Sequence, residues 1–146
     1  MVGDLSTMDP LARTQPEGTD VDLLVYGYFY ELDNKLRPVP DLATEVPTRE
    51  NGGISADGLM LTYHLRHGVK WQDGAPFSAR DVVATIEAIQ SPKNTVASRK
   101  GWDDIASAQA IGDDEVRVRL KKLYAPAPAT FFCESGLYPV LPAPAR

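Results

Sequence analysis

The 146-residue sequence contains one cysteine, Cys133, so a disulfide within the chain is excluded. Because no histidine or cationic residue lies beside Cys133 in the sequence, we expect a small buried side chain rather than a reactive thiol. The two histidines, His64 and His67, diverge on a predicted strand and the turn after it, and no third ligand lies nearby. The sequence therefore argues against a metal site.

Several other features are also missing. No apolar stretch is long enough to span a bilayer, and polar residues follow Met1–Asp4 where a secretory signal would be apolar. Taken at face value this suggests a cytoplasmic protein, although a chain that begins after a removed signal would have the same sequence. Glycine-rich phosphate loops and nucleophile elbows are absent. The net charge of −5 argues against nucleic acid as a partner. The basic residues Arg117–Lys122 are interpreted as a solvated strand face.

Twelve prolines and eleven glycines are many for this length and predict numerous turns and short elements. The clearest strand is residues 59–66, where apolar and mostly polar side chains alternate. Ser78 and Asp81 are typical of a helix start, and apolar residues at helical spacing continue that helix to Ser91-Pro92. Residues 105–110 and 115–120 predict a hairpin around Gly112.

Two shorter segments carry weaker predictions. After a polar arm (residues 1–19), Asp20 begins a predicted short helix, while a competing interpretation makes Leu23–Tyr30 a buried strand. Near the other end, Ala125–Pro128 is expected to break the chain, and Ala129–Cys133 to form a short helix.

A run of motifs covers nearly the whole chain in a fixed order. The specific core of the pattern is Leu65–Trp71 (LRHGVKW), then Asp73–Ser78 (DGAPFS), then Ala79–Val83 (ARDVV). Asp9-Pro10, Pro40–Ala43 and Leu141-Pro142 lie at matching places on either side. This order resembles the extracellular solute-binding proteins of the peptide/nickel class (family 5) of ABC importers.

The resemblance implies a fold and a domain organisation. The fold class is α+β (mixed α/β): the smaller subdomain of lobe I of a class II periplasmic-binding-protein-like fold. Residues 1–35 correspond to an arm and first helix of the larger subdomain, and residues 36–146 to the small subdomain. Because these family members are far longer, we expect an amino-terminal fragment that lacks the opposite lobe. The arm, Met1–Asp20, is then expected to be mobile or to contact a second copy in a swapped dimer.

The resemblance also implies a function that is not enzymatic: capture of a di- or oligopeptide for delivery to permease subunits in the membrane, in a periplasmic or extracytoplasmic location. Nickel complexes, haem, opines, oligosaccharides or a sensory role are alternatives. By matching position, Glu17, Gly18 and Thr19 of the arm would contact solute, with the carboxylate suited to a free amine. A second contact region is Thr95–Ser98, with Ala97 and Ser98 as candidates whose backbone would extend a peptide.

The same comparison assigns no catalytic or cofactor-binding residue. Asp73 is interpreted as a turn residue and Asp81 as a helix-start residue, not as an acid/base pair. Trp71 and Tyr63 are expected in the core. Arg66 is expected to pair with Asp73 or Asp81 and so to tie the strand to the helix.

Overall fold

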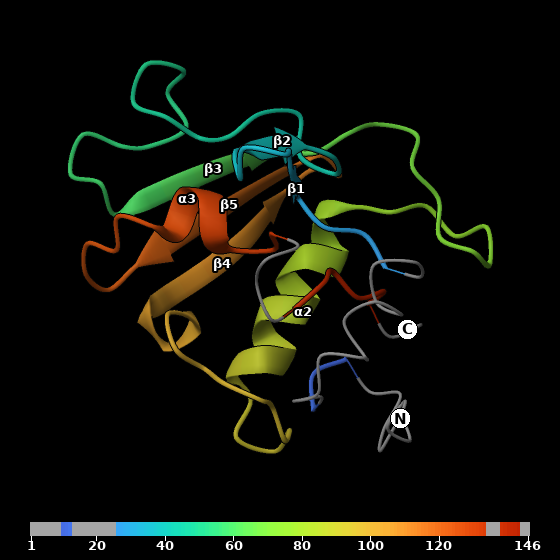
Figure 1. The fold of residues 1–146 in the computed structure, drawn as a ribbon. Helices are drawn as coiled ribbons and strands as arrows, with labels where there is room; N and C mark the ends of the chain where they lie inside the picture. Colours follow the sequence, from blue (N-terminus) through green and yellow to red (C-terminus); the bar gives the residue numbers. More distant parts are fainter. Residues whose placement is uncertain (1–9, 13–25, 134–137, 144–146) are drawn as a thin grey trace.

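A computed structural model of the protein describes residues 10–12, 26–133 and 138–143 (Figure 1). Its centre is a three-stranded antiparallel sheet in the order β3-β5-β4. The strands are β3 (Met60–His64), β4 (Ile105–Ile111) and β5 (Glu115–Leu120). The alternation that predicted these strands decides which face is buried, because Leu61, Tyr63, Val116 and Val118 all turn inward. The predicted strand and hairpin are both confirmed.

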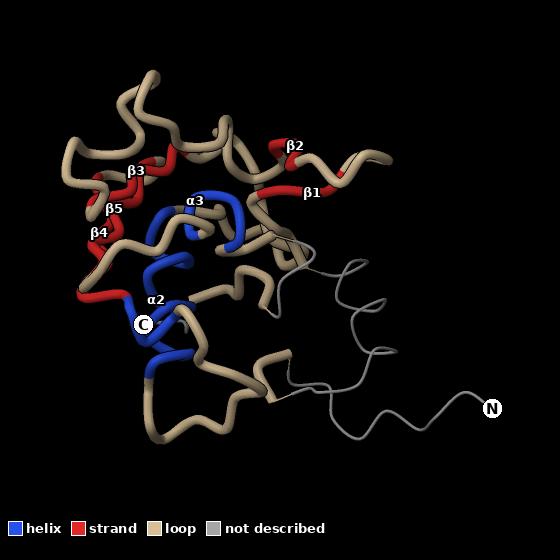
Figure 2. The backbone as a smooth tube through the Cα atoms, turned by 60° about the vertical axis from the view of Figure 1, so that its left-hand side comes forward, coloured by secondary structure: helices blue, strands red, loops and turns tan. Residues whose placement is uncertain are grey.

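Helix α2 (Ala79–Gln90) covers the inner face of the sheet and contacts β4 and β5. Its buried stripe has helical spacing and includes Val82, Ile86 and Ile89. Ser78 is the N-cap residue and forms a capping box with Asp81, as the sequence predicts. In Figure 2 the helices α2 and α3 lie on the same side of the sheet.

The short helix near the end of the chain is α3 (Ala127–Thr130), which begins earlier than the predicted Ala129–Cys133. Pro126 is its N-cap and Pro128 occupies its first turn. Proline is tolerated there because the first-turn N–H groups have no partner within a helix. The expected break at Ala125–Pro128 is confirmed for Ala125 and Pro126, which form a turn, and is wrong for Ala127 and Pro128, which lie in the helix.

A second, two-stranded sheet joins β1 (Tyr30–Leu32) and β2 (Pro38–Pro40), which run antiparallel. Tyr28, Phe29 and Tyr30 are buried. Between Tyr26 and Leu32 the backbone is not helical. The described part of the Leu23–Tyr30 segment is therefore not a helix. The short helix predicted after Asp20 lies outside the described residues.

The described part of the arm, residues 10–12, lies on its own chain. Leu11 is 7% exposed within the hydrophobic core. Its carbonyl accepts the N–H of Ala97 at 2.9 Å. These residues of the arm are therefore buried against their own chain. This differs from the expectation of an arm that is mobile or swapped into a second copy. The rest of the arm lies outside the described residues.

The predicted role of Arg66 is not found. The Asp81 carboxylate is occupied by other donors, described below, and the carboxylate that lies within electrostatic range of Arg66 is Asp41. Burial raises the pKa of Asp41, and the nearby guanidinium partly opposes this rise. Tyr63 is in the core as predicted, whereas Trp71 is only partly buried at its margin.

Candidate functional site

The N-terminus of α2 is tied to the end of the described chain by one buried carboxylate. Asp81 is 6% exposed, and its Oδ2 accepts the N–H of Ser78 at 2.8 Å and the indole N–H of Trp71 at 3.2 Å. Its Oδ1 accepts the N–H of Ala143 at 2.7 Å. One turn later, the hydroxyl of Thr85 accepts the N–H of Leu141 at 3.0 Å. These contacts hold residues 138–143 along the helix.

The C-terminus of α2 is held by a cation. Arg99 donates from Nε to the carbonyl of Ile89 at 2.9 Å, and from a terminal nitrogen to the carbonyls of Ser91 (2.8 Å) and Asn94 (2.7 Å). A guanidinium at this place satisfies carbonyls that no helical N–H reaches and complements the negative helix end. Arg99 therefore fixes the loop that follows α2 at the position next to Ser98.

Within this loop lie the two predicted contact residues that the structure describes. The N–H of Ala97 donates to the carbonyl of Leu11, so the loop and the arm meet here. The N–H of Ser98 donates to the hydroxyl of Tyr138 at 2.7 Å, and that hydroxyl donates to the carbonyl of Ser98 at 2.7 Å. Tyr138 is 1% exposed, so one buried phenol satisfies both backbone groups of Ser98.

The other predicted contact residues, Glu17, Gly18 and Thr19, lie outside the described residues. The sequence reasoning missed three residues that position the loop: Leu11, Arg99 and Tyr138. Tyr138 offered a signal, as an aromatic residue in a proline-rich segment. Arg99 offered a weaker one, as a basic residue nine positions beyond Gln90, the last residue of α2.

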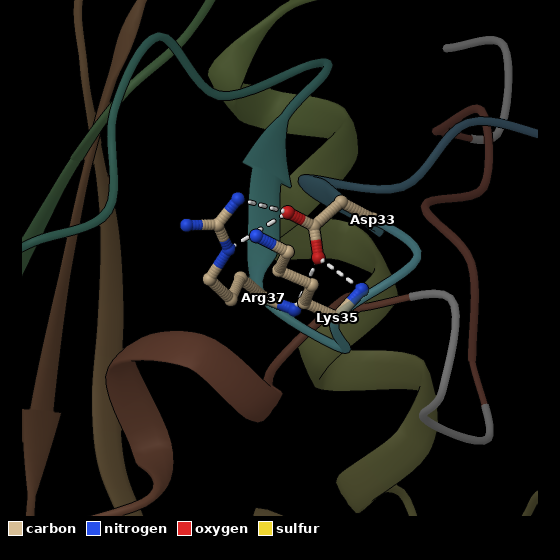
Figure 3. A network of polar contacts seen from close by, with 3 residues as sticks. All are labelled: Asp33, Lys35 and Arg37. Atoms are coloured by element: carbon tan, nitrogen blue, oxygen red, sulfur yellow. Dashed lines mark hydrogen bonds and ion pairs between the residues drawn. The ribbon is translucent and has the colours of Figure 1, made fainter.

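The turn between β1 and β2 is fixed by a second carboxylate (Figure 3). Asp33 accepts the backbone N–H groups of Lys35 (2.8 Å) and Arg37 (2.9 Å) through Oδ1, and the guanidinium of Arg37 through Oδ2. The hydrogen bonds from the Arg37 side chain and backbone hold the pKa of Asp33 below its usual range. The tip of this hairpin therefore has a defined conformation.

The pockets on the described surface are small. One, of about 120 Å³, is lined by Gly27, Leu42, Val69, Lys70, Trp71, Gln72 and Phe77. A second, of about 280 Å³, lies near Leu61, Leu123 and Tyr124, and a third, of about 250 Å³, lies near Arg66, His67 and Asp113. All three are smaller than the roughly 300–1,000 Å³ typical of sites that enclose a small ligand. None of these pockets encloses a peptide by itself.

Within the described ranges, no three histidine, cysteine or acidic side chains gather in a way that would hold a metal ion. No helix among the same residues is long and apolar enough to cross a membrane. Cys133 is buried, as the sequence predicts.

Solved structures define the class of protein. NikZ from Campylobacter jejuni in complex with Ni(L-His) superposes with a TM-score of 0.73 at 30% identity, over 86% of this chain and 24% of that chain. The oligopeptide-binding protein AppA from Bacillus subtilis, in complex with a nonapeptide, superposes with a TM-score of 0.78 at 24% identity, over 97% and 26% of the two chains. The predicted α+β fold of a substrate-binding protein is confirmed.

The family follows from the sequence match. A model of the bacterial extracellular solute-binding proteins, family 5 middle region, matches residues 37–143, and the chain belongs to this family. The glutathione-binding protein GsiB of Escherichia coli K12 is 29% identical over 119 residues, which are 82% of this chain and 22% of that protein. The chain thus spans about a fifth of the length of the curated relatives it matches.

Proposed function

We propose that this chain is part of the receptor component of an ABC importer, and that the receptor captures di- or oligopeptides and delivers them to the permease. The observation that carries the proposal is the family match over residues 37–143. Among the relatives, GsiB is named for glutathione, itself a tripeptide, and AppA holds a nonapeptide. A periplasmic or extracytoplasmic location accords with a family of extracellular proteins. The proposal assigns the chain no catalytic residue.

The proposed contact surface combines the arm with the loop after α2. Glu17, Gly18 and Thr19 form the arm's share, and Ala97 and Ser98 the loop's share. The bond between the Leu11 carbonyl and the Ala97 N–H supports this pairing, because it brings the arm to the loop six residues before Glu17. The Glu17 carboxylate suits the free amine of a peptide through a charge-assisted hydrogen bond.

A second candidate solute is a small metal chelate. NikZ, at 30% identity, was solved with a nickel–histidine complex. Because the described residues provide no cluster of metal ligands, such a solute would be bound here through its organic ligand rather than by side chains on the metal.

The test is native mass spectrometry of the polypeptide as purified from its host. A series of co-purified masses that match short peptides would support the proposal and give the length preference. A single discrete mass of a metal chelate would replace the peptide with the second candidate. A protein that is purified empty and binds neither added peptide libraries nor an added nickel–histidine complex would contradict both.

A matched pair of variants tests the site within the same receptor. Glu17→Gln is expected to weaken the binding of a peptide with a free amine roughly tenfold, because a charged hydrogen bond is lost. Glu50→Gln, at an exposed loop position, is the control and should leave binding unchanged. Equal affinities for both variants would remove Glu17 from the site.

A further inference from the structure

Three successive residues of the loop after α2 are each held by a different part of the molecule. Ala97 donates its N–H to the carbonyl of Leu11 in the arm. Ser98 forms two hydrogen bonds with the hydroxyl of Tyr138. Arg99 donates to the carbonyls at the end of α2. Because surface loops are usually less constrained than this, three anchors in a row indicate that the geometry of this loop matters.

Tyr138 occupies the side of Ser98 through which a strand would pair. The phenol hydroxyl accepts the N–H of Ser98 and donates to the carbonyl of Ser98, both at 2.7 Å. Since both groups reach the same oxygen atom, they point to the same side of the loop. A residue of an antiparallel pair uses these two groups to exchange hydrogen bonds with the residue opposite. The phenol therefore stands where a residue of an added strand would stand.

The aromatic ring of Tyr138 is itself fixed in the core. Tyr138 is 1% exposed, and its ring packs edge-on against that of Trp102, with the ring centroids 5.8 Å apart. The hydroxyl is thus held in place by packing that does not depend on Ser98.

The backbone of the neighbouring residue is engaged as well. Ala97 donates its N–H to the carbonyl of Leu11, a residue that is 7% exposed in the core. A peptide that paired with this N–H would first have to displace the arm. Strand addition is a common way in which backbone groups bind an extended peptide. The contacts of Ala97 and Ser98 disfavour it at both residues.

The side chain of Ser98 is the group that this arrangement leaves available. Its hydroxyl oxygen accepts the N–H of Lys100 at 3.2 Å. A serine hydroxyl also has one hydrogen to donate, and no residue that the structure describes accepts it. Ser98 is half-buried, so part of it faces solvent. The hydroxyl can therefore donate to an oxygen atom of a solute.

We infer that Ser98 contacts the solute through its side-chain hydroxyl, which donates to a carbonyl or carboxylate oxygen, and that Tyr138 is the positioning residue that fixes this hydroxyl. Tyr138 also withholds the backbone groups of Ser98 from the solute. The inference rests on the proposed function, because it assigns a role within the same contact surface. It specifies the kind of contact: the loop recognises the solute by a side chain and not by strand pairing.

The experiment measures the affinity of trialanine for the polypeptide as purified from its host, after removal of any co-purified solute. Ser98→Ala is expected to weaken binding roughly fivefold, because one hydrogen bond to the solute is lost. Ser98→Thr keeps a hydroxyl and should bind nearly as well as the parent protein. Ser91→Ala is the matched control, since the Ser91 hydroxyl accepts the N–H of Lys93 at 3.3 Å, the same local bond at the start of the same loop.

A second probe, trialanine amide, distinguishes the two acceptors. If Ser98 donates to a peptide carbonyl, the weakening caused by Ser98→Ala persists with the amide. If Ser98 donates to the terminal carboxylate, the weakening disappears, because the amide lacks that group.

A double-mutant cycle tests Tyr138. Tyr138→Phe keeps the ring and removes the hydroxyl, so it should accelerate solvent exchange at the Ser98 amide and weaken trialanine binding roughly fivefold. In the Ser98→Ala background it should weaken binding no further, because Tyr138 acts through the Ser98 side chain. A merely structural residue would lower affinity by the same factor in both backgrounds. Unfolding free energies, measured beside the affinities, should instead fall in both.

Three results would overturn the inference. Equal binding by Ser98→Ala and Ser91→Ala would remove the hydroxyl from the contact surface. Equal losses from Tyr138→Phe in both backgrounds would leave Tyr138 a structural role alone. Tighter binding by Tyr138→Phe would mean that the solute pairs with the freed backbone of Ser98. Failure of the proposed function is distinguishable from these, because the parent protein would then bind no trialanine, and the inference would fall with it.

Discussion

Leu36 is a residue whose backbone and side chain are both in costly environments. Its φ is 58°, in the left-handed region that residues with a Cβ rarely adopt. Its side chain is 78% exposed and so gains little from packing. Leu36 is the last residue of a turn in which its N–H donates to the carbonyl of Asp33. Glycine is ordinarily favoured at such a position.

We therefore expect Leu36→Gly to stabilise the fold by up to about 1 kcal/mol, since relief of the left-handed backbone exceeds the entropy that glycine adds to the unfolded chain. Leu36→Ala is the control, because it removes the exposed side chain but keeps a Cβ. Urea unfolding of the three proteins measures the differences. A glycine variant no more stable than the alanine variant would show that the turn stores no strain.

The buried tyrosines make stability sensitive to high pH. Burial raises the pKa of Tyr30 and of Tyr63 well above the usual value. Their phenols donate to the carbonyls of Glu45 (3.2 Å) and Ala127 (3.3 Å). In the unfolded chain both would ionise near pH 10, so the stabilisation is complete below that pH and is lost as pH rises further.

Unfolding free energies measured from pH 8 to pH 11 should therefore fall above about pH 10. Tyr63→Phe should make this fall shallower while lowering stability at pH 8 by about 1–2 kcal/mol, because the buried carbonyl of Ala127 loses its donor. An unchanged slope in the variant would mean that Tyr63 does not contribute to the alkaline transition.

At the scale of elements, helix α2 was predicted in detail because its information is local. Ser78, Asp81 and the apolar stripe lie within one short segment, and each of these signals predicts the same helix. The strand β3 and the β4–β5 hairpin were predictable for the same reason. What holds α2 in place was not, since Asp81 also binds Trp71 and Ala143, and such long-range partners leave no pattern in the sequence.

Replacement of Asp81 by alanine should lower stability by about 3 kcal/mol, because three donors lose their shared acceptor in a buried place. Asp81→Asn should cost less, since one carbonyl oxygen remains. Asp73→Ala is the matched control: this exposed carboxylate accepts one backbone N–H, that of Ala75. Thermal unfolding of the three variants measures the order, and an equal loss for Asp73 and Asp81 would contradict the role of Asp81 as a buried tie.

At the scale of the whole molecule, the candidate site joins segments far apart in sequence. The loop carrying Ala97 and Ser98 is bounded by Leu11 from the arm, by Tyr138 from the last described segment and by Arg99 from its own end. The resemblance indicated Ala97 and Ser98 by position. It did not indicate their partners, because hydrogen bonds of backbone groups are nearly independent of side-chain identity.

If Leu11 holds the arm on the loop, Leu11→Ser should release it. The loss of a buried apolar side chain weakens docking by roughly 2 kcal/mol, which corresponds to about a thirtyfold rise in opening. Solvent exchange at the Ala97 amide, which donates to the Leu11 carbonyl, should accelerate by that factor. Leu36→Ser, at an exposed leucine, is the control and should leave Ala97 unchanged.

The same measurement tests the swapped dimer that the sequence resemblance suggested. When the arm docks on its own chain, exchange at Ala97 is independent of protein concentration, because opening is a unimolecular step. When the arm is donated by a second copy, protection at Ala97 rises with concentration and is lost on dilution. Since Leu11 is buried against its own chain, we expect no dependence between about 10 and 500 μM, and protection that disappears at the lower end would establish the swapped arm instead.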